Sequence, residues 1–238
     1  MNKFQIPLGQ LDYKKAEINL RASSPAEMYR LKACEKEPKT VEWLEAFAED
    51  DIFYDVGANV GAYSLIGATK LNGKGKVYAF EPAAPTYAAL VTNVVANKKM
   101  AKIVALPIAF GAKNELSFVG LSSMEPGAAS HHQPTSQFPQ PFIVMTMDSF
   151  IEDYKIPVPT KVKIDVDGVE LTVLKGMKKT LADPKLKEVL IEVKDDAVQE
   201  RFAIENIFRA NGFVMKAKHT LISSLNGNVW NRLYVRAG

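Results

Sequence analysis

The chain has 238 residues, of which 47% are hydrophobic and 24% are charged, and its formal net charge is +3. This length and apolar content suffice for one sizeable core, so one domain with an appendage is expected. The lysines cluster without an arginine-rich stripe or interleaved aromatics, which argues against nucleic acid as a partner.

The single cysteine, Cys34, excludes an internal disulfide and fits a reducing compartment. No partner pattern surrounds it, so we interpret it as a small buried residue rather than a nucleophile. No run approaches the ~18 apolar residues that a membrane span needs. The N-terminus also lacks the basic and apolar segments of a signal peptide. We therefore expect a cytoplasmic protein with no membrane partner.

The first 50 residues are predicted to form an N-terminal arm and two short helices. Residues 1–20 show no clear period and fit a loose arm or a short hairpin. The run Ser-Pro-Ala-Glu at 24–27 is a capping box with proline at the first helical position, which predicts a helix to about Cys34. A second short helix with an apolar stripe begins at Thr40. Both helices should pack on the core formed by residues 51–238 and cover part of a ligand cleft.

From residue 52 onward, apolar strands alternate with amphipathic helices. The expected parallel strands are 52–56, 77–80, 103–106, 162–165 and 188–193. Two last strands, 213–216 and 233–236, are expected to form an antiparallel pair. This pattern predicts an α/β fold with a doubly wound, mostly parallel seven-stranded sheet of the Rossmann-like type.

A long polar segment, 120–141, separates two β-like stretches at 115–119 and 142–146. A loop this long inside a compact domain is usually functional or disordered, so we interpret it as a substrate or lid loop. It contains His131 and His132. These histidines are either solvated or, if the loop folds over the cleft, suited to proton transfer near neutral pH.

The stretch from Ile52 to Gly61 has the order of a nucleotide-cofactor corner, with a buried strand, a tight glycine turn and a helix start. Gly57 and Gly61 let the backbone approach a ligand closely. A dinucleotide site needs glycine at position 59 and backbone N–H groups facing a pyrophosphate, whereas this chain has Asn59 and the carboxylate of Asp55. A cationic ligand such as S-adenosylmethionine therefore fits this corner better than NAD.

Two further stretches place carboxylates at the ends of strands. Glu81 ends the second parallel strand, where an acidic residue can accept both ribose hydroxyls of an adenosine. The strand 162–165 delivers Asp165 and then Asp167 to the point of the sheet where ligands bind, with Lys163 on the same strand face. Glu170 falls in the first turn of the next helix, where it either contacts a substrate or only caps the helix.

Metal binding is the competing interpretation of this second stretch. Asp165, Asp167 and Glu170 are hard oxygen ligands that suit Mg²⁺ or Ca²⁺. Their spacing matches no calcium loop, however, and Lys163 would repel a cation. We therefore expect no metal.

The same stretches resemble the FkbM-type methyltransferases, which are S-adenosylmethionine-dependent enzymes of the class I fold. The resemblance rests on Asp-Val-Gly-Ala-Asn-Val-Gly-Ala-Tyr-Ser-Leu (55–65), Val-Tyr-Ala-Phe-Glu-Pro (77–82), Met-Asp-Ser-Phe (147–150) and Lys-Ile-Asp-Val-Asp-Gly-Val-Glu-Leu-Thr-Val-Leu-Lys-Gly (163–176). The run 36–43 is also similar, and the likeness extends to Arg236. One departure is Asp167, where the family usually has Glu.

The resemblance implies where the cofactor would lie. The glycine corner should surround the methionine part, Glu81 the ribose, and the backbone near Ala109 the adenine. The full predicted cofactor set is Asp55, Gly57, Ala58, Asn59, Gly61, Tyr63, Ser64, Glu81, Pro82, Ala109 and Asp165. S-adenosylhomocysteine would be the product.

The resemblance also implies the chemistry, which is transfer of a methyl group to a hydroxyl of a sugar, a polysaccharide precursor or a natural product. Asp165 is the leading base or orienting carboxylate, and Lys163 polarises the hydroxyl or positions Asp165. Asp167 and Glu170 are predicted substrate contacts, and His131 or His132 is the reserve base. A methyltransferase acting on RNA or protein, or a non-catalytic cofactor-binding module, stays as an alternative, and a homodimer is left open.

Overall fold

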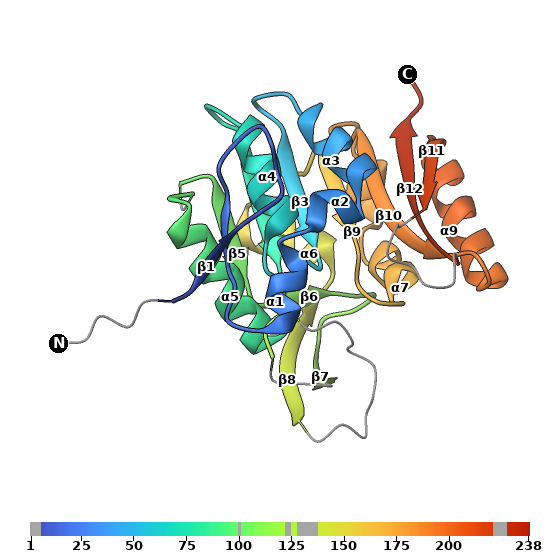
Figure 1. Cartoon of the computed structure of the whole chain (residues 1–238). Helices are drawn as coiled ribbons and strands as arrows, with labels where there is room; N and C mark the ends of the chain where they lie inside the picture. The colour runs from blue at the N-terminus through green and yellow to red at the C-terminus, as the bar shows by residue number, and fades with distance from the viewer. Residues whose placement is uncertain (1–5, 100, 122–124, 128–137, 221–227) are drawn as a thin grey trace.

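The computed structural model describes residues 6–99, 101–121, 125–127, 138–220 and 228–238. A seven-stranded mixed sheet forms its centre (Figure 1). In spatial order the strands are β11 (Phe213–Thr220), β12 (Val229–Arg236), β10 (Glu188–Lys194), β9 (Lys161–Ile164), β3 (Ile52–Val56), β4 (Lys76–Phe80) and β5 (Ile103–Leu106). The five strands from β10 to β5 are parallel, and β12 is antiparallel to both of its neighbours. The predicted fold class, including the C-terminal antiparallel pair, is confirmed.

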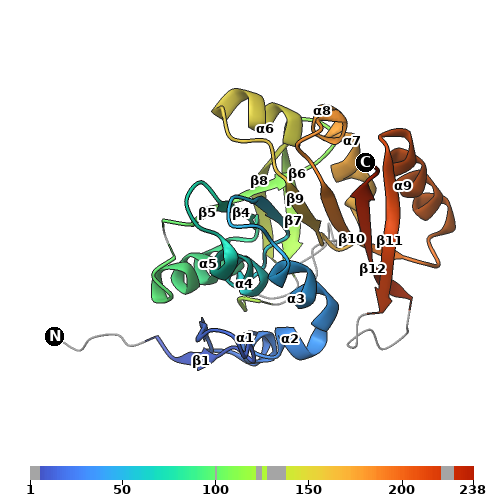
Figure 2. The ribbon, with the colours of Figure 1, turned by 90° about the horizontal axis from the view of Figure 1, so that it is seen from above.

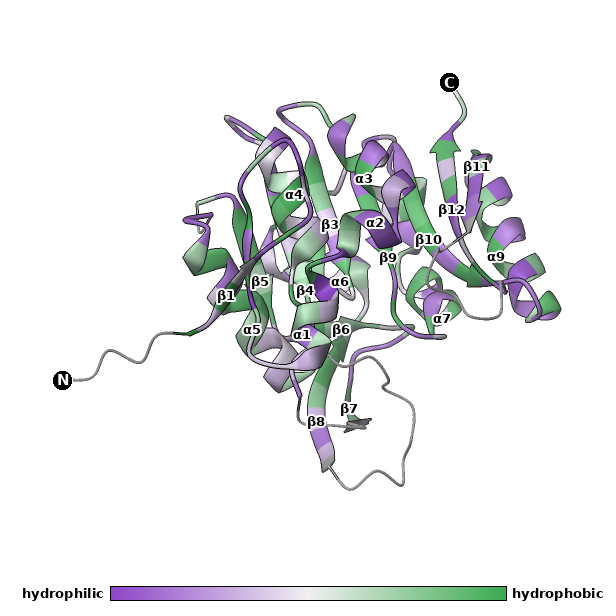
Figure 3. Cartoon of the chain, in the orientation of Figure 1, coloured by the Kyte–Doolittle hydropathy of each residue, from purple (hydrophilic) through white to green (hydrophobic). Residues whose placement is uncertain are grey.

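Helices cover both faces of this sheet (Figure 2). One face carries α3 (Pro38–Glu45), α4 (Ala62–Lys70) and α5 (Ala84–Ala96), and the other carries α6 (Met147–Tyr154), α7 (Glu170–Lys175), α8 (Lys178–Ala182) and α9 (Val198–Ala210). Successive side chains of a strand point to opposite faces, so Phe53 packs in the first cluster while Tyr54 and Val56 pack in the second. The inner strands are therefore rich in hydrophobic residues on both faces, as the green segments of the sheet in Figure 3 show, although β9 also carries Lys161 and Lys163.

The N-terminal segment adds a hairpin and two short helices. The hairpin pairs β1 (Leu8–Gln10) with β2 (Asn19–Arg21), and α1 (Pro25–Arg30) and α2 (Ala33–Lys36) follow. Ser24 caps α1 as predicted, because its hydroxyl accepts the Glu27 amide N–H at 3.2 Å. The return bond of the predicted capping box is shifted by one residue, because Glu27 Oε2 accepts the Ser23 amide N–H at 2.8 Å rather than that of Ser24. The predicted single helix is divided, because Lys32, with φ −102° and ψ 28°, separates α1 from α2. The second predicted helix is α3, which begins at Pro38 rather than at Thr40.

Two asparagines, one in α5 and one that caps its C-terminal end, hold the hairpin against the domain. The side-chain oxygen of Asn97 accepts the Asn19 amide N–H at 2.8 Å, and that of Asn93 accepts the Arg21 amide N–H at 2.6 Å. The Asn93 side chain also donates to the Val60 carbonyl at 2.8 Å. Asn93 thus joins the N-terminal hairpin to the loop that follows β3.

A small second sheet extends from the domain. It contains β6 (Ile108–Phe110), β7 (Glu115–Leu121) and β8 (Phe138–Met145), in the order β6-β8-β7. Strands β7 and β8 are antiparallel and extend further into the predicted loop 120–141 than the sequence pattern indicates. Residues 122–124 and 128–137 of that loop lie outside the described residues, so its role stays a prediction.

No helix in the described part of the chain is long and apolar enough to cross a bilayer.

Candidate active site

A cavity of about 670 Å³ opens at the carboxyl edge of the central sheet. Its walls come from the segments after β3, β4 and β9, from β6 to β8, from α1 and α2, and from the end of β10. This edge, next to the point where the strand order reverses, is where open α/β sheets bind ligands. The volume lies within the range of about 300–1,000 Å³ that is typical of small-molecule sites.

The turn after β3 forms one wall. Gly57, Asn59 and Gly61 adopt the left-handed region, with φ of 81°, 52° and 85°. A Cβ atom on Gly57 would lie 1.9 Å from the Asp165 carbonyl oxygen, so the turn packs against β9 with no room for a side chain. Among the predicted corner residues, Gly57, Ala58, Asn59 and Tyr63 line the cavity; Gly61 instead precedes α4 as its N-cap.

Asp55 and Ser64 lie behind this wall. Neither belongs to the cavity lining within the described residues, and both are fully buried. The Ser64 hydroxyl donates to Asp55 Oδ2 at 2.5 Å, which ties α4 to β3. Burial raises the pKa of Asp55, against the opposing effects of the Lys163 charge and the Ser64 hydrogen bond. The geometry gives both residues a structural role, and their contact with a cofactor stays a prediction.

Glu81 and Pro82 follow β4 and line the cavity, as does Ala109 on β6. The Glu81 carboxylate is held by the backbone, since its two oxygens accept the Asn59 and Ala83 amide N–H groups at 3.0 and 2.9 Å. These bonds fix the orientation of the Glu81 carboxylate, whose oxygens are acceptors. That arrangement suits the ribose role predicted for it.

A buried ion pair forms the floor of the cavity. Lys163 Nζ lies 2.6 Å from Asp165 Oδ2, and the lysine side chain is 2% exposed. The Tyr63 ring lies beneath the ammonium, 4.9 Å from its centroid to Nζ. Burial opposes the charge on Lys163, but Asp165, Glu37 and Asp55 outweigh it and raise the lysine pKa. The Lys163 charge in turn lowers the pKa of Asp165 despite its burial, so the pair is ionised.

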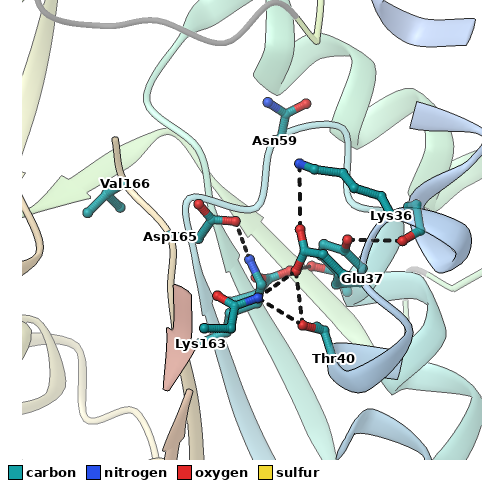
Figure 4. A network of polar contacts seen from close by, with 12 residues as sticks. Lys36, Glu37, Thr40, Asn59, Lys163, Asp165 and Val166 are labelled. Carbon is teal, nitrogen blue, oxygen red and sulfur yellow. Dashed lines mark hydrogen bonds and ion pairs between the residues drawn. The ribbon is translucent and has the colours of Figure 1, made fainter. Parts of the chain in front are cut away.

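Glu37 joins this floor to the N-terminal helices and to β12. Its Oε2 accepts the Thr40 hydroxyl at 2.9 Å and the Asn231 side-chain amide at 3.0 Å, and Lys36 Nζ lies 3.6 Å from Oε1 (Figure 4). Lys36 and Glu37 both line the cavity. Neither residue was among the predicted site residues. The only indication of a role in the sequence is that both lie in the run 36–43, which resembles the family.

The segment after β9 separates its predicted substrate residues. Asp167 lines the cavity and has φ of 56°. Asp tolerates this left-handed conformation better than a longer side chain does, which is a physical reason for its presence where the family usually has Glu. Glu170 instead caps the turn, because its Oε1 accepts the Gly168 amide N–H at 3.0 Å, and it does not belong to the described lining. Its substrate role stays a prediction.

The remaining candidates concern metals and histidines. Within the described residues, no group of three or more His, Cys, Asp or Glu side chains could hold a metal ion. His131 and His132 lie outside the described residues.

The sequence analysis also missed Glu192. This residue lies near the end of β10, lines the cavity and is partly buried. Burial and the nearby Asp165 charge raise the pKa of Glu192 to about 9, against the opposing effect of Lys163. Its run, Ile-Glu-Val, has the form of an ordinary buried strand, which explains why sequence reasoning passed over it.

Comparison with solved structures identifies the class of fold. The methyltransferase FkbM from Methylobacillus flagellatus matches with a TM-score of 0.58 at 16% identity, over 79% of this chain and 44% of that chain. A putative rRNA-methylase from Clostridium thermocellum gives 0.55 at 9% identity, over 85% of this chain and 96% of that chain. Aeropyrum pernix fibrillarin with natively bound S-adenosyl-L-methionine gives a TM-score of 0.51 at 13% identity, over 84% of this chain and 74% of that chain. These likenesses establish the class I methyltransferase fold.

The sequence comparisons then identify the family. The methyltransferase FkbM domain matches residues 55–215. Hexuronic acid methyltransferase AglP from Haloferax volcanii is 30% identical over 171 residues, which are 71% of this chain and 67% of that protein. The chain belongs to the FkbM methyltransferase domain family and is an S-adenosylmethionine-dependent methyltransferase, as the sequence motifs predict.

Proposed function

We propose that this protein transfers the methyl group of S-adenosylmethionine to a hydroxyl of a sugar, within a glycan precursor or a sugar-bearing small molecule. The observation that carries the proposal is that the glycine corner and the buried Lys163–Asp165 pair face one cavity. A cofactor side and a proton-handling side therefore meet in a single space. The similarity to a hexuronic acid methyltransferase supports a carbohydrate as the acceptor.

The residues present fit S-adenosylmethionine. Glu81 offers an oriented carboxylate for ribose hydroxyls, and Gly57 lets the turn pack closely against the Asp165 backbone at the cavity wall. Besides Glu192, whose raised pKa of about 9 keeps it mostly protonated near neutral pH, five acidic side chains line the described cavity (Glu37, Glu81, Glu115, Asp165 and Asp167) against four cationic side chains (Arg30, Lys36, Lys113 and Lys163). An excess of carboxylates favours a cationic ligand over a dinucleotide, whose pyrophosphate is anionic.

The chemistry requires that charge and a proton be handled together. When bound, S-adenosylmethionine supplies a methyl group on a positively charged sulfur, and that charge is lost as the methyl leaves. The protein's part is to hold the acceptor oxygen in line and to exclude water from the cavity. It must also receive the hydroxyl proton, because a neutral hydroxyl is a poor nucleophile.

The cavity lining also includes residue types that suit a carbohydrate. They are the aromatic side chains of Tyr29, Phe118 and Phe142, together with Arg30. Two donor atoms of the Arg30 guanidinium, Nε and Nη2, bond to the Gly127 carbonyl at 3.2 and 2.8 Å, which fixes the group while its other N–H donors remain. A fixed guanidinium suits a carboxylate, so an acidic sugar is the favoured acceptor.

RNA is a poorer candidate for the acceptor. A phosphate backbone needs a track of cations, and the described cavity lining has more carboxylates than cations. Methyl transfer to RNA with a steep dependence on salt would replace the carbohydrate proposal.

Two measurements test the proposal in turn. Thermal-shift titration should show stabilisation by S-adenosylmethionine and S-adenosylhomocysteine, and not by NAD. Methyl transfer should then be assayed by mass spectrometry on a panel of neutral sugars, uronic acids and their glycosides. A stronger shift with NAD would overturn the cofactor, and turnover confined to RNA or protein would overturn the acceptor.

The variant Arg30→Ala tests whether the acceptor is an acidic sugar. We expect its KM for a uronic acid acceptor to rise about 10–100-fold, the loss of one charge-assisted contact worth about 1.5–3 kcal/mol. The KM for a neutral sugar should change little. Arg209→Ala, which alters an exposed arginine on α9, is the matched control. Equal effects of Arg30→Ala on acidic and neutral acceptors would contradict recognition of a carboxylate.

A further inference from the structure

Glu192 and Asp165 occupy equivalent places on neighbouring strands. Strands β9 and β10 are parallel and in register up to Ile164 and Ile191, so Asp165 and Glu192 are the next residues of the two strands. Side chains two residues apart share a strand face, so both carboxylates lie on the face that carries Lys163. Both line the same cavity. The floor therefore offers two adjacent carboxyl groups to an acceptor.

The two groups differ in their partners. Asp165 is bound by the Lys163 ammonium at 2.6 Å. Within the described part of the chain, no hydrogen bond or ion pair is formed by the Glu192 carboxyl, and the neighbouring Asn231 amide on β12 is directed to Glu37 and Thr40 instead. One carboxylate is therefore committed to a cation, and the other is available.

The surrounding charges increase this difference. Glu192 faces Asp165 from β9, Glu37 from the N-terminal helices and Glu170 from the start of α7, and Lys163 is the cation that opposes them. These carboxylates and burial raise the pKa of Glu192 to about 9, while Lys163 lowers the pKa of Asp165. A base of higher pKa binds a proton more strongly, so Glu192 is the stronger proton acceptor of the two.

We propose that Glu192 accepts the proton of the acceptor hydroxyl, and that Asp165, held by Lys163, is a positioning residue. This assignment rests on the proposed function. As the acceptor oxygen bonds to the methyl carbon, the carbon–sulfur electron pair stays on sulfur and the hydroxyl proton passes to a Glu192 carboxylate oxygen. The products are a methyl ether, a neutral thioether and protonated Glu192, which returns its proton to solvent before the next turnover.

The assignment fixes the form of the pH profile. Only ionised Glu192 can take a proton, so kcat/KM should rise with pH with a midpoint near pH 9 and level off above it. Glu192→Gln should lower kcat by about 10²–10⁴-fold, the usual contribution of a general base, and remove this rise. Asp165→Asn should keep the rise but move its midpoint to lower pH, because one negative charge beside Glu192 is lost.

The experiment compares wild type, Glu192→Gln, Asp165→Asn and Glu49→Gln. Glu49 is exposed, precedes β3 and has no ion pair in the described structure, so it controls for loss of a carboxylate. S-adenosylhomocysteine binding by calorimetry should be nearly equal in wild type, Glu192→Gln and Glu49→Gln, which shows that each is folded. Infrared titration of the carboxyl groups should locate a transition near pH 9 that Glu192→Gln lacks.

The outcomes separate this assignment from the proposed function. An unchanged pH profile in Glu192→Gln, or a profile abolished by Asp165→Asn alone, would overturn the role of Glu192 while methyl transfer stands. A product that is a base-labile methyl ester would do the same, because a carboxylate acceptor has no proton to lose. If wild-type protein transfers no methyl group to any acceptor, both proposals are overturned.

Discussion

The two sides of the cavity are built in different ways. The proposed cofactor side consists of one short turn, Gly57 to Gly61, and the adjacent Glu81, and most of its shape is backbone. The proposed acceptor side takes side chains from α1, α2, β7, β8 and β10, which are far apart in the sequence. The first side depends on conformation at a few positions, whereas the second depends on long-range packing and on balanced charges.

This difference determines what a substitution does in each place. On the cofactor side, an added methyl group collides with fixed backbone. On the acceptor side, removal of one charge leaves its former partners buried and uncompensated. Four substitutions, with Gly61→Ala as a control for one of them, test the contrast from the largest expected effect to the smallest.

Lys163→Met should be the most damaging. It removes the cation beside Asp165, Glu37 and Asp55 while keeping a side chain of similar length. Breaking a buried pair by loss of one partner costs about 3–5 kcal/mol, so urea denaturation should show a loss of stability of that size at pH 7.

The pH dependence of the stability of Lys163→Met shows whether the loss comes from the missing charge. The lowered pKa of Asp165 contributes stability that is present above the ordinary Asp pKa and is lost as pH falls through the folded-state pKa. Lys163→Met removes this contribution, so its stability deficit relative to wild type should shrink in strong acid. A deficit of the same size at all pH values would indicate lost packing rather than lost charge.

Gly57→Ala should abolish most cofactor binding with less effect on folding. Its Cβ would meet the Asp165 carbonyl oxygen at 1.9 Å, and its φ of 81° is strained for any residue with a Cβ by about 1–2 kcal/mol. We expect S-adenosylhomocysteine affinity to fall by about 100-fold or more in calorimetric titration.

Gly61→Ala is the matched control for that turn. Its φ of 85° is similar, but its Cβ would meet Leu90 Cδ1, the far end of a flexible side chain, at 2.4 Å. Gly61→Ala should therefore bind S-adenosylhomocysteine more tightly than Gly57→Ala does. Equal losses in the two variants would show that strain alone, and not the approach to β9, governs the corner.

Asn231→Ala tests the link between β12 and the N-terminal helices. The buried amide donates to Glu37 and Thr40, and its loss leaves acceptors unsatisfied at a cost of about 1–3 kcal/mol. Thermal unfolding should show that loss, with a raised KM for the acceptor and little change in S-adenosylhomocysteine affinity. If only S-adenosylhomocysteine affinity fell and the acceptor KM did not change, the division of the cavity into two sides would be contradicted.

Glu192→Gln should have the smallest effect on stability, and in the opposite direction. A raised carboxyl pKa means that the folded protein binds more protons than the unfolded chain between the ordinary Glu pKa and about 9, so stability falls as pH rises through that window. The neutral amide avoids this loss. At pH 9 the variant should therefore unfold at a higher Tm than wild type. No gain should appear near pH 5.

The contrast also explains what could be predicted from the sequence. The sheet and the cofactor corner depend on local patterns: apolar strands in a row, glycines that permit left-handed turns, and a carboxylate at a strand end. For that reason Glu81, Lys163 and Asp165 could be selected from the sequence as candidate site residues. Asp55 shows the limit, because the same pattern does not reveal that its side chain turns to Ser64 behind the cavity.

The residues of the acceptor side come together only through the pairing register of the strands and the packing of segments that are distant in the sequence. Glu192 becomes notable only when β10 is aligned beside β9, and Glu37 only when α3 packs near β12. Neither residue stands out in its own neighbourhood, since one is a polar position in a strand and the other precedes Pro38. Side-chain chemistry there is a property of the assembled fold.

The Asn93 amide gives the molecule a mechanical connection between distant parts. It bonds to the N-terminal hairpin through Arg21 and to the cofactor loop through Val60. Local opening of either segment breaks a bond on the same side chain, so their opening free energies are linked. A ligand that orders the loop after β3 will therefore also slow amide hydrogen exchange in the hairpin, a segment that forms no part of the described cavity wall.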